Sequence, residues 1–343
     1  DRCEPSTSTE MEVEAITASV GTQTSFEEQT SFDQAIDLLA KTEAEIEDLK
    51  ARLQREEFVP ENISDDVKMK ALTSFTKNEF FGFYKFLNIE KDLSDGSTRR
   101  PIDRFFLFFV KLRTGISSEF LSVVFEIPVS TVSEDFNYVT EVVYEKLKLL
   151  FIFPCKSQVI QYMPPAFRMH FKDVRIFVEC VEFEIEEPSS PKEQRMTFSH
   201  DKNANTIKGM IGITPNAAIS FISELYCGNI SYKQLFIESK LMNHLEPNNI
   251  VMADKGFLIA NELESIGCRL QCPIFLEDTI QLDIPEMVGN SKLSNEQVTV
   301  ERAIERIKQY KYFQGKLPYG SLHTVNRVFF IASMSCNFHK KIV

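Results

Sequence analysis

Three acidic residues that are far apart in the sequence stand where their carboxylates could converge. Glu179 lies inside VRIFVECVEFEI (residues 174–185), an apolar run that predicts a buried strand. Asp254 ends a second short apolar run, and Glu301 lies in VTVERAIERIK, which predicts a helix. A carboxylate in a buried strand must be paired, protonated or bound to a metal ion, because burying it alone costs several kcal/mol.

Two strand-borne acids and one helix-borne acid can meet at one edge of a sheet, where they repel one another unless a divalent cation neutralises them. Hard oxygen ligands suit Mg²⁺ or Mn²⁺, which usually keep water ligands and bind substrate phosphates. Two such ions can stabilise the attacking and leaving oxygens of an in-line phosphoryl displacement. The positions of Glu179, Asp254 and Glu301 therefore predict a catalytic metal site.

Each acid also has an ordinary structural explanation. A neighbouring base such as Arg175 could satisfy Glu179. Asp254 could be a helix cap or turn residue at a strand end, and Glu301 could pair with Arg302 on a solvated helix face. The residues alone leave the joint site and these separate roles open.

The elements that would position these acids form an α/β pattern after Pro165. Three strands follow one another with short links and are expected to be antiparallel neighbours, at residues 174–185, 206–215 and 218–226. A helix, a strand ending at Asp254, a further helix, the strand RLQCPIF and a last helix near residue 295 come next. This order predicts a mixed sheet flanked by helices.

Residues 64–155 are predicted to be helical, with three helices in the second half and the short link EIPVS before the third. That pattern is typical of a helix-turn-helix, in which Ser130, Thr131 and Ser133 could contact DNA. Three helices that only pack on one another would give the same pattern. Further candidates for phosphate contacts, unless they are plain surface charges, are Arg99, Arg100, Arg104, Lys308, Lys311 and Lys316.

The first part of the chain is predicted to be separate from this body. Residues 1–30 are rich in Ser, Thr and Glu with little periodicity, which predicts a disordered linker. Residues 31–58 are predicted to contain a coiled coil or a single amphipathic helix, and a coiled coil through residues 32–53 would join a homo-oligomer or another partner. The apolar seam consists of Phe32, Ala35, Leu39, Thr42, Ile46, Leu49 and Leu53.

The bulk composition fits a globular protein without a membrane span. Of 343 residues, 43% are hydrophobic, with 30 Phe and no Trp. No apolar run reaches the roughly 20 residues of a spanning helix, and FFLFFV at residues 105–110 predicts a core helix instead. Seven scattered Cys predict reduced thiols in an intracellular protein. Residues 1–60 carry a net charge of −10 of the total −12, whereas residues 300–343 carry +6, which is compatible with phosphate contacts.

Several ordered motifs resemble those of a known family of DNA-processing enzymes. LRTGISSEFLSVVFEIPVSTVSEDFN is similar to the family's helix-turn-helix, and FRMHFKDVRIFVECVEFEIEEPSSP to its first catalytic strand. HDKNANTIKGMIGITPNAAISFISELYCGNIS is similar to the next two strands, IVMADKGF to the second acidic motif, and VERAIERIK to the helix that carries the third. The chain thus resembles the DDE superfamily transposases of the PIF/Harbinger-related type, including those that follow a THAP zinc domain.

The resemblance implies an RNase H-like fold over residues 165–340, a DDE metal site that uses Mg²⁺ or Mn²⁺, and DNA cleavage and strand transfer in the nucleus. It assigns the three catalytic acids, which would also be the metal ligands, to Glu179, Asp254 and Glu301. Glu182 matches an acid that follows closely in the family's first motif.

Three positions depart from the family's pattern. Glu179 stands where the family has Asp, Tyr232 where it commonly has Asp, and Val181 where Thr is commoner. A carboxylate displaced by roughly 1 Å can cost about a hundred-fold in rate. Two hypotheses follow: a metal-dependent DNA endonuclease or transposase, and a domesticated, non-catalytic scaffold for DNA or protein binding. A third is a regulator whose nucleic-acid contact lies in a zinc domain upstream of Asp1.

Overall fold

The structure, a computed structural model, describes most of the chain. The described stretches are residues 36–50, 57–94, 98–150, 153–253, 256–272 and 302–339. The chain divides into two compact units, residues 1–58 and residues 59–343, and each is considered by itself.

In the first unit, residues 36–50 form a helix. Its apolar seam is exposed to solvent, at Leu39 (63% exposed), Ile46 (46%) and Leu49 (50%). The remaining apolar residues of the predicted seam, Phe32, Ala35 and Leu53, lie outside the described residues, as does the predicted linker 1–30. The coiled coil and the packed amphipathic helix therefore both stay predictions for residues 31–58.

The second unit begins with a helical region whose helix ends follow from the sequence. A capping box of Thr76 and Glu79 starts α3, and Ser117 caps α6 by accepting a hydrogen bond from the Phe120 amide. The elements are the 3₁₀-helix η1 (Pro60–Asn62), α2 (Asp66–Thr73), α3 (Lys77–Leu87), α4 (Glu90–Leu93), α5 (Pro101–Thr114), α6 (Ser118–Val124), α7 (Val129–Leu150), α8 (Lys156–Tyr162) and α9 (Pro165–His170).

Phenylalanine rings form the core of this helical region. The predicted core helix over residues 105–110 is confirmed, because none of its six side chains is more than 2% exposed. Phe109 packs edge-on against Phe75 and Phe80, with ring centroids 5.3 Å and 6.4 Å away. None of the described helices is long and apolar enough to cross a bilayer.

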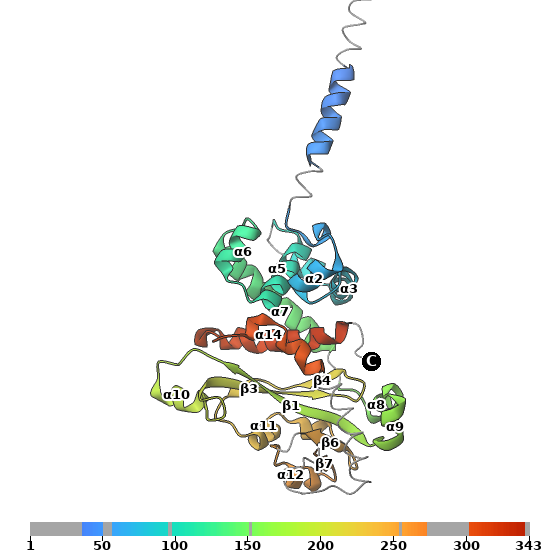
Figure 1. The fold of residues 1–343 in the computed structure, drawn as a ribbon, viewed down its shortest axis with the longest axis vertical. Helices are drawn as coiled ribbons and strands as arrows, with labels where there is room; N and C mark the ends of the chain where they lie inside the picture. The colour runs from blue at the N-terminus through green and yellow to red at the C-terminus, as the bar shows by residue number, and fades with distance from the viewer. Residues whose placement is uncertain are drawn as a thin grey trace, which may run out of the picture. The chain divides into compact units, whose positions relative to one another are not determined.

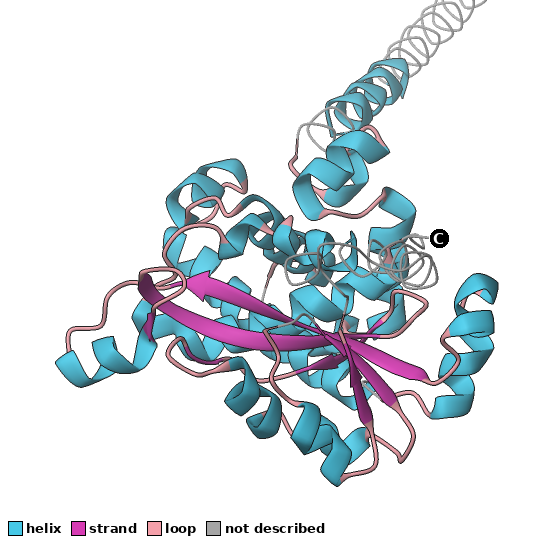
Figure 2. Ribbon diagram, turned by 60° about the horizontal axis from the view of Figure 1, so that its bottom comes forward, coloured by secondary structure: helices cyan, strands magenta, loops and turns pink. Residues whose placement is uncertain are grey.

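The sheet consists of β1 (Val174–Glu184), β2 (Phe198–Ser199), β3 (Ala204–Ile213), β4 (Ile219–Ile222), β5 (Tyr226–Cys227), β6 (Ile250–Ala253) and β7 (Arg269–Gln271). Over the described residues the strand order is β2-β3-β1-β6-β7, and β4 and β5 also pair with β3. Strand β1 is antiparallel to β3 and parallel to β6, which is parallel to β7. This curved mixed sheet between helices (Figure 2), preceded by an all-helical region, confirms the predicted RNase H-like α/β fold.

The third predicted strand, residues 218–226, is interrupted. Residues 223–225 separate β4 from β5, and side chains accept the hydrogen bonds of two backbone amides there. The Ser223 hydroxyl accepts from the Met210 amide, and the Asn326 side chain accepts from the Leu225 amide. Contacts of this kind across the fold leave no local pattern in the sequence.

Helices cover both faces of the sheet. Helix α14 (Leu322–Ser335) lies along one face, and α11 (Tyr232–Glu238) and α12 (Ala260–Ser265) along the other (Figure 1). Phe183 of β1 packs on Phe329 of α14, whereas Val178 faces the core under α11 and α12. The remaining elements are α10 (Pro191–Thr197), η2 (Leu241–His244), the helical residues 302–308, η4 (Lys311–Phe313), η5 (Tyr319–Ser321) and η6 (Cys336–Phe338).

A close backbone contact joins the helical region to the second half of the chain. Helix α5 ends at Gly115, whose φ of +64° favours glycine. A Cβ atom at this position would lie 2.6 Å from the backbone oxygen of Lys311. Gly115 therefore lets the end of α5 lie directly on η4.

We expect Gly115→Ala to destabilise the protein more than Gly315→Ala. Gly315 also has a positive φ, +83°, but nothing lies within 4 Å of a Cβ placed there. The control substitution carries only the left-handed strain of about 1–2 kcal/mol, whereas Gly115→Ala must also displace the Lys311 backbone. Urea denaturation of the two variants measures the difference, and equal losses would argue against the close contact.

Candidate functional site

Glu179 lies in the middle of β1, the central strand of the described sheet, and is half-buried. Its pairing partner on β3 is Ile211. On the other side of β1, Val178 pairs with Ala253, the last residue of β6. Strand β6 thus ends directly beside Glu179, which is the arrangement that a shared acidic site needs.

The other two predicted acids, Asp254 and Glu301, lie outside the described residues. Asp254 follows Ala253 in the sequence, and the helical residues 302–308 begin directly after Glu301. Within the described stretches no group of three or more His, Cys, Asp or Glu side chains could hold a metal ion. A Glu179 oxygen is the hard donor that Mg²⁺ and Mn²⁺ prefer, so its chemistry fits such an ion, and the three-acid site stays a prediction.

Arg175 does not neutralise Glu179. Its guanidinium donates a hydrogen bond to the Pro154 carbonyl and lies 4.7 Å from the centre of the Phe153 ring. Four residues of strand also separate Arg175 from Glu179, a distance of about 13 Å. The alternative in which Arg175 satisfies Glu179 is therefore wrong.

The second acid of this strand, Glu182, is neutralised inside the protein. Side chains alternate along a strand, so Glu179 and Glu182 project from opposite faces of the sheet. Glu182 pairs in register with Lys208 of β3, and its carboxylate lies 3.7 Å from the Lys208 ammonium. Thr206 donates a further hydrogen bond of 2.6 Å to the same carboxylate oxygen. Because Lys208 is only 5% exposed, water screens this ion pair weakly.

Tyr232, at the start of α11, covers the Lys208–Glu182 pair. Its ring centre lies 5.3 Å from the Lys208 ammonium, within reach of a cation–π interaction. The other face of the ring stacks on Phe257, at 5.4 Å between centroids. Burial, reinforced by nearby acidic groups including Glu182, raises the pKa of the Tyr232 phenol, which keeps it neutral near pH 7. A neutral ring thus stands where an Asp would add a carboxylate.

Sequence patterns predicted neither the Lys208–Glu182 pair nor its cover. One signal was present: Thr206 and Lys208 are two residues apart in a strand, so they share one face of it. The register that brings this face against Glu182 is a property of the folded sheet.

The helices α5, α6 and α7 form the predicted helix-turn-helix arrangement. Ser130, Thr131 and Ser133 lie in the first turns of α7; Ser130 is exposed, and the other two are half-exposed. Their positions are compatible with contact to a ligand at the start of this helix. Contact with DNA stays a prediction for all three residues.

The candidate basic residues differ in how far carboxylates already engage them. Arg99 and Arg104 both pair with Asp135, which is 4% exposed. Arg100 pairs with Glu61 and Asp103. Such carboxylates compete with phosphate, so these arginines hold the helical region together.

The lysines of the C-terminal segment differ in the same way. Lys308 pairs with Glu305 at 3.3 Å on the exposed side of the helical residues 302–308. Lys311 and Lys316 are exposed, and no ion pair of the described residues includes either of them. Their charges therefore remain available to a ligand.

Two family models match the chain. Residues 178–337 match the DDE superfamily endonuclease, and residues 100–149 match the helix-turn-helix of DDE superfamily endonuclease. The chain contains a DDE superfamily endonuclease domain. Its helix-turn-helix is also present and covers α5 to α7. A search of curated proteins gives no significant match.

The match to the DDE superfamily endonuclease begins at Val178, one residue before Glu179, and spans all three predicted acids. DDE superfamily endonucleases generally use divalent metal ions. With the helix-turn-helix, this domain supports a transposase-like protein that binds DNA.

We expect Lys208→Met to destabilise the DDE domain by about 3 kcal/mol, because it leaves the Glu182 carboxylate buried without its counter-ion. Lys308→Met is the matched control, since it breaks a lysine–glutamate pair in which both side chains are at least 60% exposed, for a loss below about 1 kcal/mol. Urea denaturation at neutral pH measures both. Adding Glu182→Gln to Lys208→Met should restore part of the loss, and equal midpoints for the two single variants would refute the buried pair.

Proposed function

We propose that this chain is a transposase-derived DNA-binding protein of the nucleus, in which the DDE domain acts as a scaffold and its endonuclease activity is degraded. It would belong to the PIF/Harbinger-related type that follows a THAP zinc domain. The observation that carries the proposal is the Tyr232 ring lying on Lys208 beside Glu182. Glu182 is already paired with Lys208, and Tyr232 supplies no carboxylate for a metal ion.

The position of Glu179 also supports a degraded endonuclease activity. It is one methylene longer than the Asp of the family pattern, and it lies on a central strand that is paired on both sides. The backbone of such a strand cannot easily shift to compensate, so a misplacement of roughly 1 Å would cost about a hundred-fold in rate. The acid is kept while the geometry for catalysis is weakened.

The competing function is a divalent-metal DNA endonuclease. It is favoured by the end of β6 beside Glu179, which would bring Asp254 to the same strand ends. Glu179, Asp254 and Glu301 would hold Mg²⁺ or Mn²⁺, an ion that neutralises the acids and stabilises charge on the phosphodiester oxygens. The carboxylates of this chain would bind and orient the ion.

A supercoiled-plasmid nicking assay in Mg²⁺ and in Mn²⁺ distinguishes these functions. We expect the natural chain to nick no faster than Asp254→Asn, and the double variant Glu179→Asp/Tyr232→Asp to nick measurably faster. The reason is that the double variant shortens one acid and adds another.

Metal-dependent nicking by the natural chain that disappears in Asp254→Asn would establish the competing endonuclease. Binding of labelled duplex DNA, measured in parallel without divalent ions, tests the DNA-binding part. A chain that neither binds nor nicks DNA would contradict both functions.

The exposed seam of the helix 36–50 supports a further part of the proposal, which is self-association or partner binding through residues 32–53. Leu39, Ile46 and Leu49 are each at least 46% exposed. Apolar residues at this spacing are buried when two helices form a coiled coil. The seam would therefore link two copies of the chain.

We expect Leu39→Glu/Ile46→Glu to convert a dimer into a monomer, because it places charges in the seam. Light scattering coupled to size-exclusion chromatography measures the mass. Lys41→Glu adds an acid outside the seam and should leave the mass unchanged. A natural chain that is already monomeric would contradict self-association.

A further inference from the structure

A groove of about 590 Å³ opens where the helix-turn-helix meets the C-terminal segment of the DDE domain. Lys111 of α5, Ser133 and Asn137 of α7, and Lys311 and Lys316 of the C-terminal segment all line it. The Phe136 and Tyr312 rings stack at 5.5 Å between centroids, which joins the two sides. Residues that are distant in the sequence thus build one concave surface.

The groove is cationic in a chain of net charge −12. Three lysines line it, and no Asp or Glu is among its lining residues. No ion pair of the described residues includes Lys111, Lys311 or Lys316. A surface of this kind attracts anions because its positive charge is not balanced locally.

Lys111 contributes the most enclosed charge. Its ammonium donates a 2.7 Å hydrogen bond to the Ser118 hydroxyl and lies 4.8 Å from the centre of the Phe136 ring. Burial lowers the pKa of Lys111, and the negative charge of Glu119 opposes this shift. An anion in the groove would therefore raise the pKa of Lys111 and favour its charged form.

The polar residues of α7 fit the same ligand. Ser133 and Asn137 are four residues apart, so they lie on one face of the helix and both line the groove. Hydroxyl and amide groups donate hydrogen bonds to phosphate oxygens, which position a protein on a nucleic-acid backbone.

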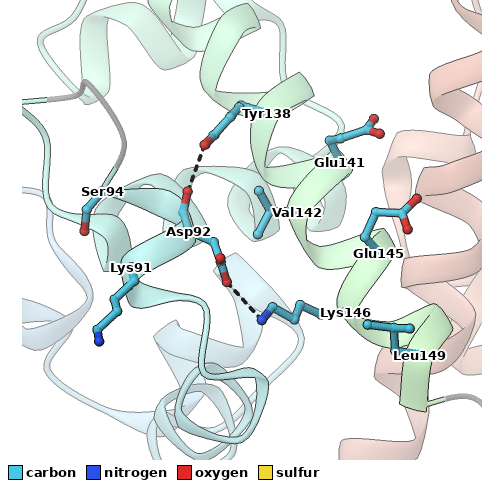
Figure 3. A pocket seen from close by; sticks show the side chains of 9 residues that line it. All are labelled: Lys91, Asp92, Ser94, Tyr138, Glu141, Val142, Glu145, Lys146 and Leu149. Carbon is cyan, nitrogen blue, oxygen red and sulfur yellow. Dashed lines mark hydrogen bonds and ion pairs between the residues drawn. The ribbon is translucent and has the colours of Figure 1, made fainter.

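A second pocket on the same helical region shows the contrast. It lies between α4 and α7 and is lined by Asp92, Glu141 and Glu145 together with Lys91 and Lys146 (Figure 3). Lys146 pairs with Asp92 at 3.0 Å, which consumes one of the two positive charges. An anionic ligand is therefore disfavoured in that pocket and favoured in the groove.

The outer wall of the groove is fixed to the sheet. Leu317, beside Lys316, exchanges backbone hydrogen bonds of 2.9 Å with Glu184 and 2.8 Å with Glu186, at the end of β1. The segment that carries Lys316 is thus attached to β1, the strand that carries Glu179.

We infer that this groove binds backbone phosphates of duplex DNA, so that the helix-turn-helix and the DDE domain contact the same stretch of DNA. The inference rests on the proposed DNA-binding function and assigns its contact surface. It adds Lys111 and Asn137 to Ser133, Lys311 and Lys316, which the sequence had indicated. Arg99 and Arg100 are not part of this contact surface, because carboxylates already pair with them.

The test compares the natural chain with Lys311→Gln/Lys316→Gln on a fluorescent duplex of random sequence. Fluorescence anisotropy is measured from about 50 to 200 mM salt, where phosphate contacts dominate non-specific binding. Each lost contact lowers the slope of log affinity against log salt by about 0.9, so the variant should lose about 2 from the slope and roughly tenfold or more in affinity.

The matched control is Lys308→Gln, which removes a lysine three positions upstream that lies outside the groove and pairs with Glu305. Affinity and slope should remain near those of the natural chain. Both substituted groove lysines are exposed, so circular dichroism should report an unchanged melting midpoint. A second variant, Ser133→Glu, introduces a negative charge without removing a lysine and should also weaken binding.

Each outcome has a distinct meaning. Natural-chain binding with unchanged affinity in the groove variants would overturn the groove and leave the proposed function intact. An equal loss of DNA affinity in Lys308→Gln would show that the effect depends only on net charge, which would overturn the groove as well. No DNA binding by the natural chain would defeat the proposed function itself, and displacement of DNA by inorganic phosphate at constant ionic strength would assign the groove to a free anion instead.

Discussion

The pairing of β1 on both of its edges is the constraint on which the rest of this protein depends. Strand β1 is antiparallel to β3 and parallel to β6, and its end also exchanges hydrogen bonds with Leu317. A strand paired in this way has a fixed register, because a slip of one residue would move every side chain to the opposite face. The register places Glu179 beside the end of β6 and Glu182 opposite Lys208.

That register gives two acids of one strand different roles. Glu182 lies on the α11 side, where Lys208 and Thr206 satisfy it and the Tyr232 ring covers the lysine. Glu179 lies on the other face, next to the strand end from which the chain continues into Asp254. The first acid is part of the folded core, whereas the second remains at the position where DDE chemistry would take place. Substitutions around the first are therefore expected to alter stability, and substitutions at the second to leave the folded core largely unchanged.

The sequence predicted those parts of the protein that local patterns specify. The apolar run of β1, the helix-turn-helix and the core helix over residues 105–110 all depend on neighbours within a few residues. The pairs Lys208–Glu182 and Arg104–Asp135 join residues 26 and 31 positions apart, and their partners are chosen by strand register and helix packing. Arg99 and Arg100 were predicted as candidates for phosphate contacts because the sequence does not show the carboxylates that pair with them. The side chain of Asn326, which interrupts the third strand, comes from a helix a hundred residues away.

The contact of Gly115 with the Lys311 backbone has a mechanical consequence. Together with the packing of α7 on α14, it holds the helix-turn-helix against the DDE domain at two separate places. Under the proposed function, a duplex bound to the first part would lie at a fixed distance from the second. The missing side chain of one residue thus sets how closely these two parts approach each other.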